Sequence, residues 1–194
     1  MRERMRTVIG GYTPRLIGST DFVPAAVMLL LYERAGQEHL LFQVRSQHVE
    51  YHKGEISLPG GARDPEDASL QATALREVHE EIGVAPEHVE VFGRIDDFTT
   101  RTRFVMAPYV GAITAPAPYP FRAARREVEL LLEVPVAHLL SPLAVEETID
   151  ATGRRGRSYR YGEHLIFGAT ARVVEAFLAL LGPALAAEAA AGSR

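Results

Sequence analysis

The sequence contains no cysteine and no tryptophan among its 194 residues. Without cysteine the chain forms no disulfide and no thiolate metal site, which fits a reducing cytoplasm. The longest apolar run, at residues 23–32, is about half as long as the roughly 20 residues that span a bilayer. Residues 1–10 lack the apolar core of a secretory signal. We therefore expect a cytoplasmic protein that has no membrane partner.

The chain also lacks an excess of positive charge. It has 25 acidic residues against 21 lysines and arginines, for a formal net charge of -4. General nucleic-acid binders are usually basic, so we expect no nucleic-acid partner. A local basic pocket for a small anionic ligand is still compatible with this balance. The hydrophobic fraction of 47% and the length suit one globular domain.

The order of expected elements indicates a mixed α/β or α+β sandwich. Strands are expected at 23–32 and 39–46, joined by a turn at Gly36, and then at 56–58, 88–100, 103–113 and 127–134. Three short strands follow within 145–168, with Gly153 and Gly156 in the reversal, and a last helix covers 169–192 with a break at Gly182-Pro183. No repeat or linker divides the chain, so we expect one domain over residues 1–194. Residues 1–20 would be an N-terminal extension and 183–194 a fraying alanine-rich tail.

The clearest expected helix lies between Asp67, a good N-cap, and Gly83, a good C-terminal stop. At about 100° per residue, Glu77, Glu80 and Glu81 share one face of this helix. An adjoining, mainly apolar stripe consists of Gln71, Leu75, Val78 and Ile82. We therefore expect the helix to pack on a core by one side and to present an acidic wall on the next.

Three like charges on one helix face repel one another, so something should offset them. A hard divalent cation, Mg²⁺ or Mn²⁺, would do so with carboxylate ligands. Arg76 stands four residues before Glu80 and can orient that carboxylate. The preceding Gly60-Gly61 pair lets backbone groups approach a metal or phosphate. Without the glycines, a solvated helix face with ordinary salt bridges would explain the charges as well.

From Gly61 to Val84 the sequence resembles the Nudix box, the signature of hydrolases that cleave a nucleoside diphosphate linked to another group. The closing half, "REVHEEIGV" from Arg76 to Val84, matches the box in full. The opening half departs in two ways. The glycine-to-arginine spacing is one residue longer than usual, and Ala68 stands where a glutamate is expected. Asp67 is our candidate for orienting Arg76 from that side.

The preceding stretch, "LLFQVRSQHVEYHKGEISLPGG" at 40–61, resembles the additional motif of coenzyme A pyrophosphatases within the Nudix superfamily. The resemblance rests on Arg45-Ser46, on Gly54 and on residues 58–61, and this subfamily shares the extra residue before Arg76. Departures are Glu50, where the subfamily often has a basic residue, and Leu58, where it has phenylalanine. The resemblance implies an α/β/α sandwich around a mixed sheet, with the box as loop-helix-loop.

Pyrophosphate hydrolysis needs an activated water and a neutralised phosphate, which divalent cations supply. Glu77 and Glu81 are the first candidates as metal ligands, because they face the same way one turn apart. Glu80 is a third ligand or a base, and the Gly61 carbonyl is a backbone ligand. Glu127 is a candidate base outside the box; further candidates are Glu129, Glu146 and Glu147.

By resemblance the substrate is coenzyme A or a derivative, split into 3′,5′-ADP and 4′-phosphopantetheine. Basic side chains are expected near its phosphates, and the candidates are Arg45, Lys53 and Arg63. Each of them could equally well be a solvated surface charge. A second hypothesis is hydrolysis of another nucleoside diphosphate, such as ADP-ribose or NADH. A third is a non-catalytic nucleotide-binding module, against which the complete glutamate set argues.

Overall fold

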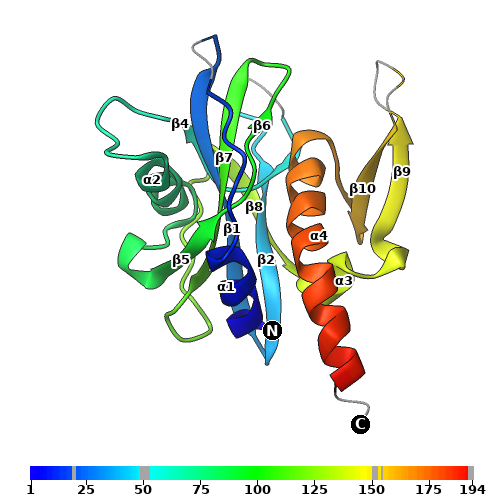
Figure 1. The fold of residues 1–194 in the computed structure, drawn as a ribbon. Coiled ribbons are helices and arrows are strands. Elements are labelled where there is room, and N and C mark those ends of the chain that lie inside the picture. Colours follow the sequence, from blue (N-terminus) through cyan, green and yellow to red (C-terminus); the bar gives the residue numbers. More distant parts are fainter. Residues whose placement is uncertain (19–20, 49–52, 150–152, 154, 192–194) are drawn as a thin grey trace.

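The computed structural model describes residues 1–18, 21–48, 53–149, 153 and 155–191. A large mixed sheet is covered on one face by α2 (Leu70–Ile82) and on the other by α1 (Arg2–Gly10) and α4 (Gly168–Ala191) (Figure 1). A smaller sheet lies beyond α4. This arrangement confirms the expected α/β/α sandwich. None of the helices in the described ranges is long and apolar enough to cross a membrane.

Within the described residues, the large sheet has eight strands, and its centre is the parallel pair β1 and β7. Its other pairings are antiparallel. The strands are β1 (Val23–Arg34), β2 (Gln37–Arg45), β3 (Ile56–Ser57), β4 (Gly60–Ala62), β5 (Val89–Arg94), β6 (Phe98–Thr99), β7 (Phe104–Ile113) and β8 (Val128–Pro135).

The smaller sheet has the order β11-β10-β9. Its strands are β9 (Val145–Ile149), β10 (Arg155–Tyr161) and β11 (His164–Ile166), and the short helices are η1 (Pro86–His88), α3 (Val136–Leu139) and η2 (Pro142–Ala144). Gly156 was expected in the reversal between two strands, but it lies inside β10 opposite Thr148. Its position was wrong because strand pairing resumes at Arg155, directly after the reversal.

Successive residues of β1 face opposite sides of the sheet. Met28 and Leu30 pack with the apolar face of α2, whereas Leu29 and Leu31 pack with residues of α4. Because both faces are covered, the strand reads as a continuous apolar run rather than an alternating one.

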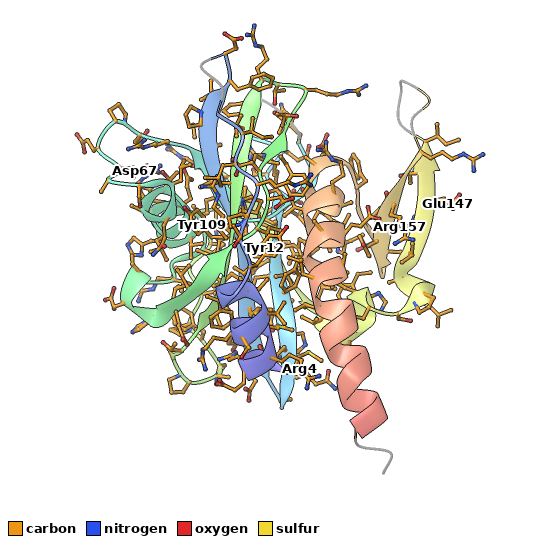
Figure 2. The ribbon with its side chains drawn as sticks, viewed as in Figure 1. Arg4, Tyr12, Asp67, Tyr109, Glu147 and Arg157 are labelled. Carbon is orange, nitrogen blue, oxygen red and sulfur yellow. The ribbon has the colours of Figure 1, made fainter. Side chains whose placement is uncertain are left out.

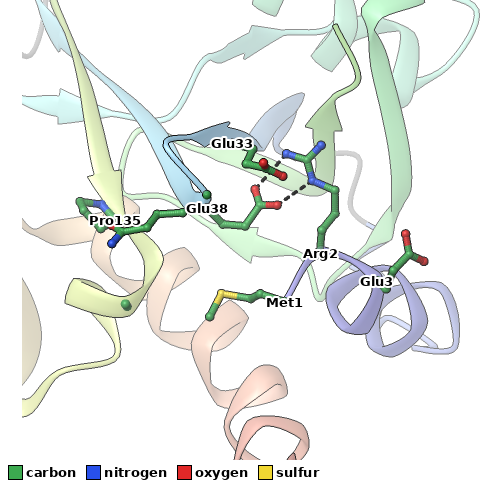
Figure 3. A pocket seen from close by; sticks show the side chains of 9 residues that line it. Met1, Arg2, Glu3, Glu33, Glu38 and Pro135 are labelled. Carbon is green, nitrogen blue, oxygen red and sulfur yellow. Dashed lines mark hydrogen bonds and ion pairs between the residues drawn. The ribbon is translucent and has the colours of Figure 1, made fainter. Parts of the chain in front are cut away.

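The helix α1 lies within the expected N-terminal extension and buries Met5 and Ile9 in the α4-side core. Arg2 donates from Nε and Nη2 to the two carboxylate oxygens of Glu38, over 2.7 and 3.0 Å (Figure 3). It also donates to the carbonyl of Ile113. These bonds connect α1 to β2 and to the end of β7.

The boundaries of two helices differ from those expected. The helix α2 begins at Leu70 with Ser69 as its N-cap, and the Ser69 hydroxyl accepts from Ala72 N over 3.1 Å. Asp67 was wrong as the cap because its carboxylate is engaged by Arg76 instead. The end at Gly83, with φ of 74°, is as predicted.

The last helix, α4, continues through Gly182-Pro183 to Ala191, so the expected break is wrong. A proline inside a helix removes one backbone hydrogen bond, and its ring crowds the carbonyl four residues earlier. The preceding turns of α4 are anchored by the buried side chains of Val174, Phe177 and Leu181, and a helix fixed in this way withstands that loss. Fraying of the alanine-rich end stays a prediction.

Candidate functional site

Two adjacent glycines bring the loop before α2 against the centre of the sheet. In β4, Gly60 pairs with Val27 and Gly61 with Ala26 of β1. A Cβ atom on Gly60 would lie 2.7 Å from Val27 Cα, where no side chain fits. A Cβ atom on Gly61 would lie 2.7 Å from Cδ of Glu77. Gly60 therefore lets the strands pair, and Gly61 makes room for a carboxylate.

Glu81 is the most enclosed of the three helix glutamates, with an exposed fraction of 3%. Its Oε1 accepts from Gln43 Nε2 over 2.8 Å, and its Oε2 accepts from Gly60 N over 2.9 Å. Burial raises the pKa of Glu81 to about 7; the charges of Glu77 and Glu127 add to the rise, while the two hydrogen bonds oppose it. The Glu81 carboxylate thus lies in a buried, negatively charged environment.

Glu77 and Glu80 have different surroundings from Glu81. The Glu77 side chain is 15% exposed, and burial raises its pKa although Arg76 opposes the shift. The Glu80 side chain is 56% exposed. The expected acidic wall therefore runs from an exposed edge at Glu80 to a buried edge at Glu81, a difference in depth that a helical wheel does not give.

Arg76 connects the glutamates to the preceding loop. Its Nη1 donates to Glu77 over 3.0 Å and to Glu80 over 2.9 Å, so the expected contact with Glu80 is confirmed. Its Nε and Nη2 donate to the two oxygens of Asp67 over 3.1 and 3.0 Å. The expectation that Asp67 orients Arg76, where Ala68 replaces the usual glutamate, is confirmed. Arg76 also holds the pKa of Asp67 well below its usual range.

Two further groups hold Asp67 in place. The Thr73 hydroxyl donates to its Oδ2 over 2.9 Å, and Asp64 N donates to the same oxygen over 3.0 Å. Asp67 and Thr73 are both buried. The orientation of Arg76 is therefore fixed by a network that spans the loop and the first turn of α2.

The candidate bases separate into two places. Glu127 is exposed just before β8, and its charge raises the pKa of both Glu77 and Glu81. Glu146 accepts from Arg160, and Glu147 is paired with Arg155. Both lie on β9, on the side of the molecule opposite Asp67 and α2 (Figure 2). Glu129 is exposed on β8. Electrostatic coupling to the helix glutamates therefore favours Glu127.

The basic candidates also differ in their surroundings. Arg45 ends β2, and its Nε is buried without a hydrogen-bond partner among the described residues. Arg63 donates from Nη2 to the Asp67 carbonyl over 2.9 Å, which explains it as a loop contact. Lys53 is exposed in the turn before β3, and Glu50 lies outside the described residues. Of the three, Arg45 is the one with a buried donor that lacks a partner in the described part of the chain.

Sequence reasoning missed Gln43, which contacts Glu81 from 38 residues away. The signal was a single amide in the apolar run "HLLFQV". A buried amide needs a hydrogen-bond partner, so its presence in such a strand indicates a buried polar group nearby.

The donor set fits a hard divalent cation. Glu81 is buried close to the charges of Glu77 and Glu127, and the donors to its own oxygens, Gln43 and Gly60, are neutral. Across the described ranges, no three histidine, aspartate or glutamate side chains already form a metal-ligand cluster. Mg²⁺ does not need one, because it keeps several waters and takes one or two carboxylates together with substrate phosphates.

Comparisons with known proteins agree with this geometry. Residues 22–114 match the model of the NUDIX domain family. A Salmonella paratyphi B protein named "Uncharacterized Nudix hydrolase NudL" is 36% identical over 174 residues, covering 87% of this chain and 88% of the relative. A NUDIX hydrolase structure from Alicyclobacillus acidocaldarius matches with a TM-score of 0.54 at 18% identity, covering 84% of this chain and 93% of that one.

A C. elegans Ap4A hydrolase complex matches with a TM-score of 0.50 at 15% identity, covering 61% of this chain and 83% of that one. At these identities the two solved structures show the fold alone, whereas the Salmonella relative shows the family. The chain therefore belongs to the Nudix hydrolase family and is a pyrophosphatase that acts on a nucleoside diphosphate derivative.

Proposed function

We propose that this Nudix hydrolase cleaves coenzyme A or an acyl derivative into 3′,5′-ADP and 4′-phosphopantetheine or its acyl form, using Mg²⁺ or Mn²⁺. The observation that carries the proposal is the motif from Arg45 to Gly61 that runs directly into the Nudix box. The fold supports it by pairing the start of this motif, at Arg45, with its middle, at Gly54 and Glu55. Arg45 N donates to the Glu55 carbonyl and Gly54 N donates to the Arg45 carbonyl.

The same motif reaches the buried glutamate of the box. Its last strand, β4, supplies the Gly60 N–H that binds Glu81. The Arg45 side chain belongs to β2, the strand that also carries Gln43. The coenzyme A-type motif and the helix glutamates therefore border one region, where a diphosphate and an additional 3′-phosphate would meet both.

The proposed roles follow from these surroundings. Glu77 and Glu81, with the Gly61 carbonyl, would hold the cation, which supplies an acidified water and neutralises the diphosphate charge. Glu80, exposed and oriented by Arg76, is a third ligand or the base. Glu127, whose charge acts on Glu77 and Glu81, is the alternative base.

Phosphate binding is proposed for the basic candidates. The Arg45 side chain is partly exposed, and its Nε lacks a partner among the described residues, so its guanidinium suits a charge-assisted bond to a phosphate oxygen. Lys53 lies in the turn before β3 and Arg63 in the loop after β4, and both would contribute more weakly. We further propose that the protein acts on this small-molecule substrate in the cytoplasm, as a single domain and without a nucleic-acid or membrane partner.

Product analysis tests the substrate. The protein is incubated with Mg²⁺ or Mn²⁺ and, separately, coenzyme A, ADP-ribose, NADH and Ap4A, and the products are identified by mass. We expect 3′,5′-ADP and 4′-phosphopantetheine from coenzyme A as the fastest reaction. Formation of AMP from ADP-ribose without cleavage of coenzyme A would replace the proposed substrate, and no turnover of any compound would favour a nucleotide-binding module.

A further inference from the structure

Gln43 is a buried polar side chain in an apolar strand. The three residues before it in β2, Leu40, Leu41 and Phe42, are fully buried, and Gln43 itself is 1% exposed. Burial of an amide is unfavourable unless hydrogen bonds replace those to water. The reason for a glutamine at this position is therefore its partner.

That partner is Glu81. Gln43 Nε2 donates to Glu81 Oε1 over 2.8 Å, while Gly60 N donates to Glu81 Oε2 over 2.9 Å. The two donors belong to β2 and β4, two strands of the same sheet. Each oxygen of the carboxylate is thus held by one sheet strand, so the rotation of the carboxylate plane is fixed.

The contact with Glu81 leaves the oxygen of the Gln43 amide without a hydrogen bond among the described residues. A carboxylate that binds a cation is ionised and only accepts hydrogen bonds, so the amide must turn its NH₂ group toward Glu81 and its oxygen away. The Gln43 Oε1 is buried and finds no partner among the described residues. The amide is therefore oriented so that it binds Glu81, although this leaves its own oxygen without a partner.

Ser57 is a polar neighbour that Gln43 does not bind. It is the direct cross-strand neighbour of Gln43 in β3, and its hydroxyl is likewise buried without a partner in the described part of the chain. Cross-strand neighbours are close enough to interact. If Gln43 served to stabilise the sheet, the Ser57 hydroxyl of the adjacent strand would be an available partner, yet the amide binds Glu81 instead.

We propose that Gln43 is a positioning residue that holds the Glu81 carboxylate in the orientation required to bind the divalent cation. The inference rests on the proposed function only in assigning Glu81 to the cation; it does not depend on coenzyme A as the substrate. Outer partners that orient metal ligands typically change metal affinity or activity by about 10- to 100-fold when removed.

The test uses Gln43→Met, which keeps an unbranched side chain of similar length but has no donor. We expect a roughly 10-fold or larger rise in the Mn²⁺ dissociation constant, measured by electron paramagnetic resonance on the full chain without nucleotide. In parallel, kcat should fall by about 10-fold or more with KM within about twofold, measured on the substrate that the unmodified protein turns over. The melting temperature should change little.

Ser57→Ala is the matched control, because it removes a buried polar atom beside Gln43 without touching Glu81. It should leave Mn²⁺ binding and kcat within about twofold. Gln43→Asn, which keeps the amide but is one methylene too short, should lose Mn²⁺ affinity as Gln43→Met does and decides the question if the latter fails to fold. Failure of both Gln43 variants to fold would make Gln43 a structural residue and overturn the proposal.

Two other results would also overturn it: unchanged Mn²⁺ affinity in Gln43→Met, or an equal loss in Ser57→Ala. The substrate proposal fails independently. If the unmodified protein binds Mn²⁺ but cleaves ADP-ribose and not coenzyme A, the proposed substrate is wrong while the Mn²⁺ titrations still decide the role of Gln43.

Discussion

The two faces of the large sheet bury different kinds of side chain. The face under α4 is packed with apolar residues such as Leu29, Phe42 and Phe177. The face under α2 also has an apolar cluster, but there the buried Gln43 and Glu81 form a polar contact. Apolar packing tolerates substitutions of similar volume, whereas a buried polar contact fails when one partner is removed. Damage to the α4 face should therefore appear in stability, and damage to the α2 face in activity.

The largest expected effect is loss of activity on the α2 face. Glu81→Gln keeps the shape of the side chain but removes the charge that would bind the cation. We expect kcat to fall by roughly 1,000-fold, with a melting temperature equal to or above that of the unmodified protein, because a buried charge is lost. Steady-state kinetics and thermal unfolding check both parts. A near-normal kcat would remove Glu81 from the proposed metal site.

The opposite pattern is expected on the α4 face. Phe177→Ala removes a fully buried ring and should lower the free energy of unfolding by about 3–5 kcal/mol. Because Phe177 belongs to the α4-side core, kcat per folded molecule at 25 °C should stay within about twofold. Urea unfolding and kinetics at low temperature measure the two quantities. A loss of kcat in the fully folded variant would show that the two faces are coupled.

A smaller effect is expected where the α2 face meets the preceding loop. Asp67→Ala releases the Nε side of Arg76 and should lower kcat by about 10-fold through misplacement of Glu77 and Glu80. Adding Ala68→Glu to this variant restores the glutamate common in other Nudix boxes and should recover part of the activity. Full activity in Asp67→Ala would contradict a role of Asp67 in orienting Arg76.

The smallest expected effect is a pH dependence of stability. Burial raises the Glu81 pKa from 4.5 to about 7, so the folded state binds this proton more tightly than the unfolded state. Stability should therefore decrease as pH rises from about 4.5 to about 7, and level off above that range. Urea unfolding with a metal chelator, compared between the unmodified protein and Glu81→Gln, isolates this contribution. Parallel pH profiles in the two proteins would contradict the raised pKa.

The sequence predicted the parts of the fold that depend on local pattern. The apolar run at 23–32, the Gly83 stop and the Arg76–Glu80 spacing all have the structures expected of them. Each depends on residues a few positions apart, where periodicity and glycine conformation are informative. The order of elements indicated a mixed sandwich, and the resemblance to the Nudix box added its three-layer α/β/α arrangement.

What the sequence left out depends on contacts between distant segments. Aspartate is a residue type that commonly caps helices, so the sequence favoured Asp67 as the N-cap. In the structure Asp67 binds Arg76, nine residues later, and Ser69 is the N-cap. The depth of Glu81 and the role of Gln43 arise from how α2 sits on β2 and β4. A helical wheel carries no information on that docking, so the sequence placed Glu81 on the acidic face without showing that it is buried.

The contact between Gly61 and the Glu77 carboxylate has a consequence for distant relatives. A methyl group at 61 and the Glu77 carboxylate would occupy the same volume. Loss of the glycine should therefore accompany loss or displacement of the carboxylate, and the two positions should change together in alignments. A homologue with a larger residue at 61 and no acid at 77 is expected to keep the sandwich fold but not the hydrolase activity. These two positions therefore distinguish active from inactive relatives before any assay.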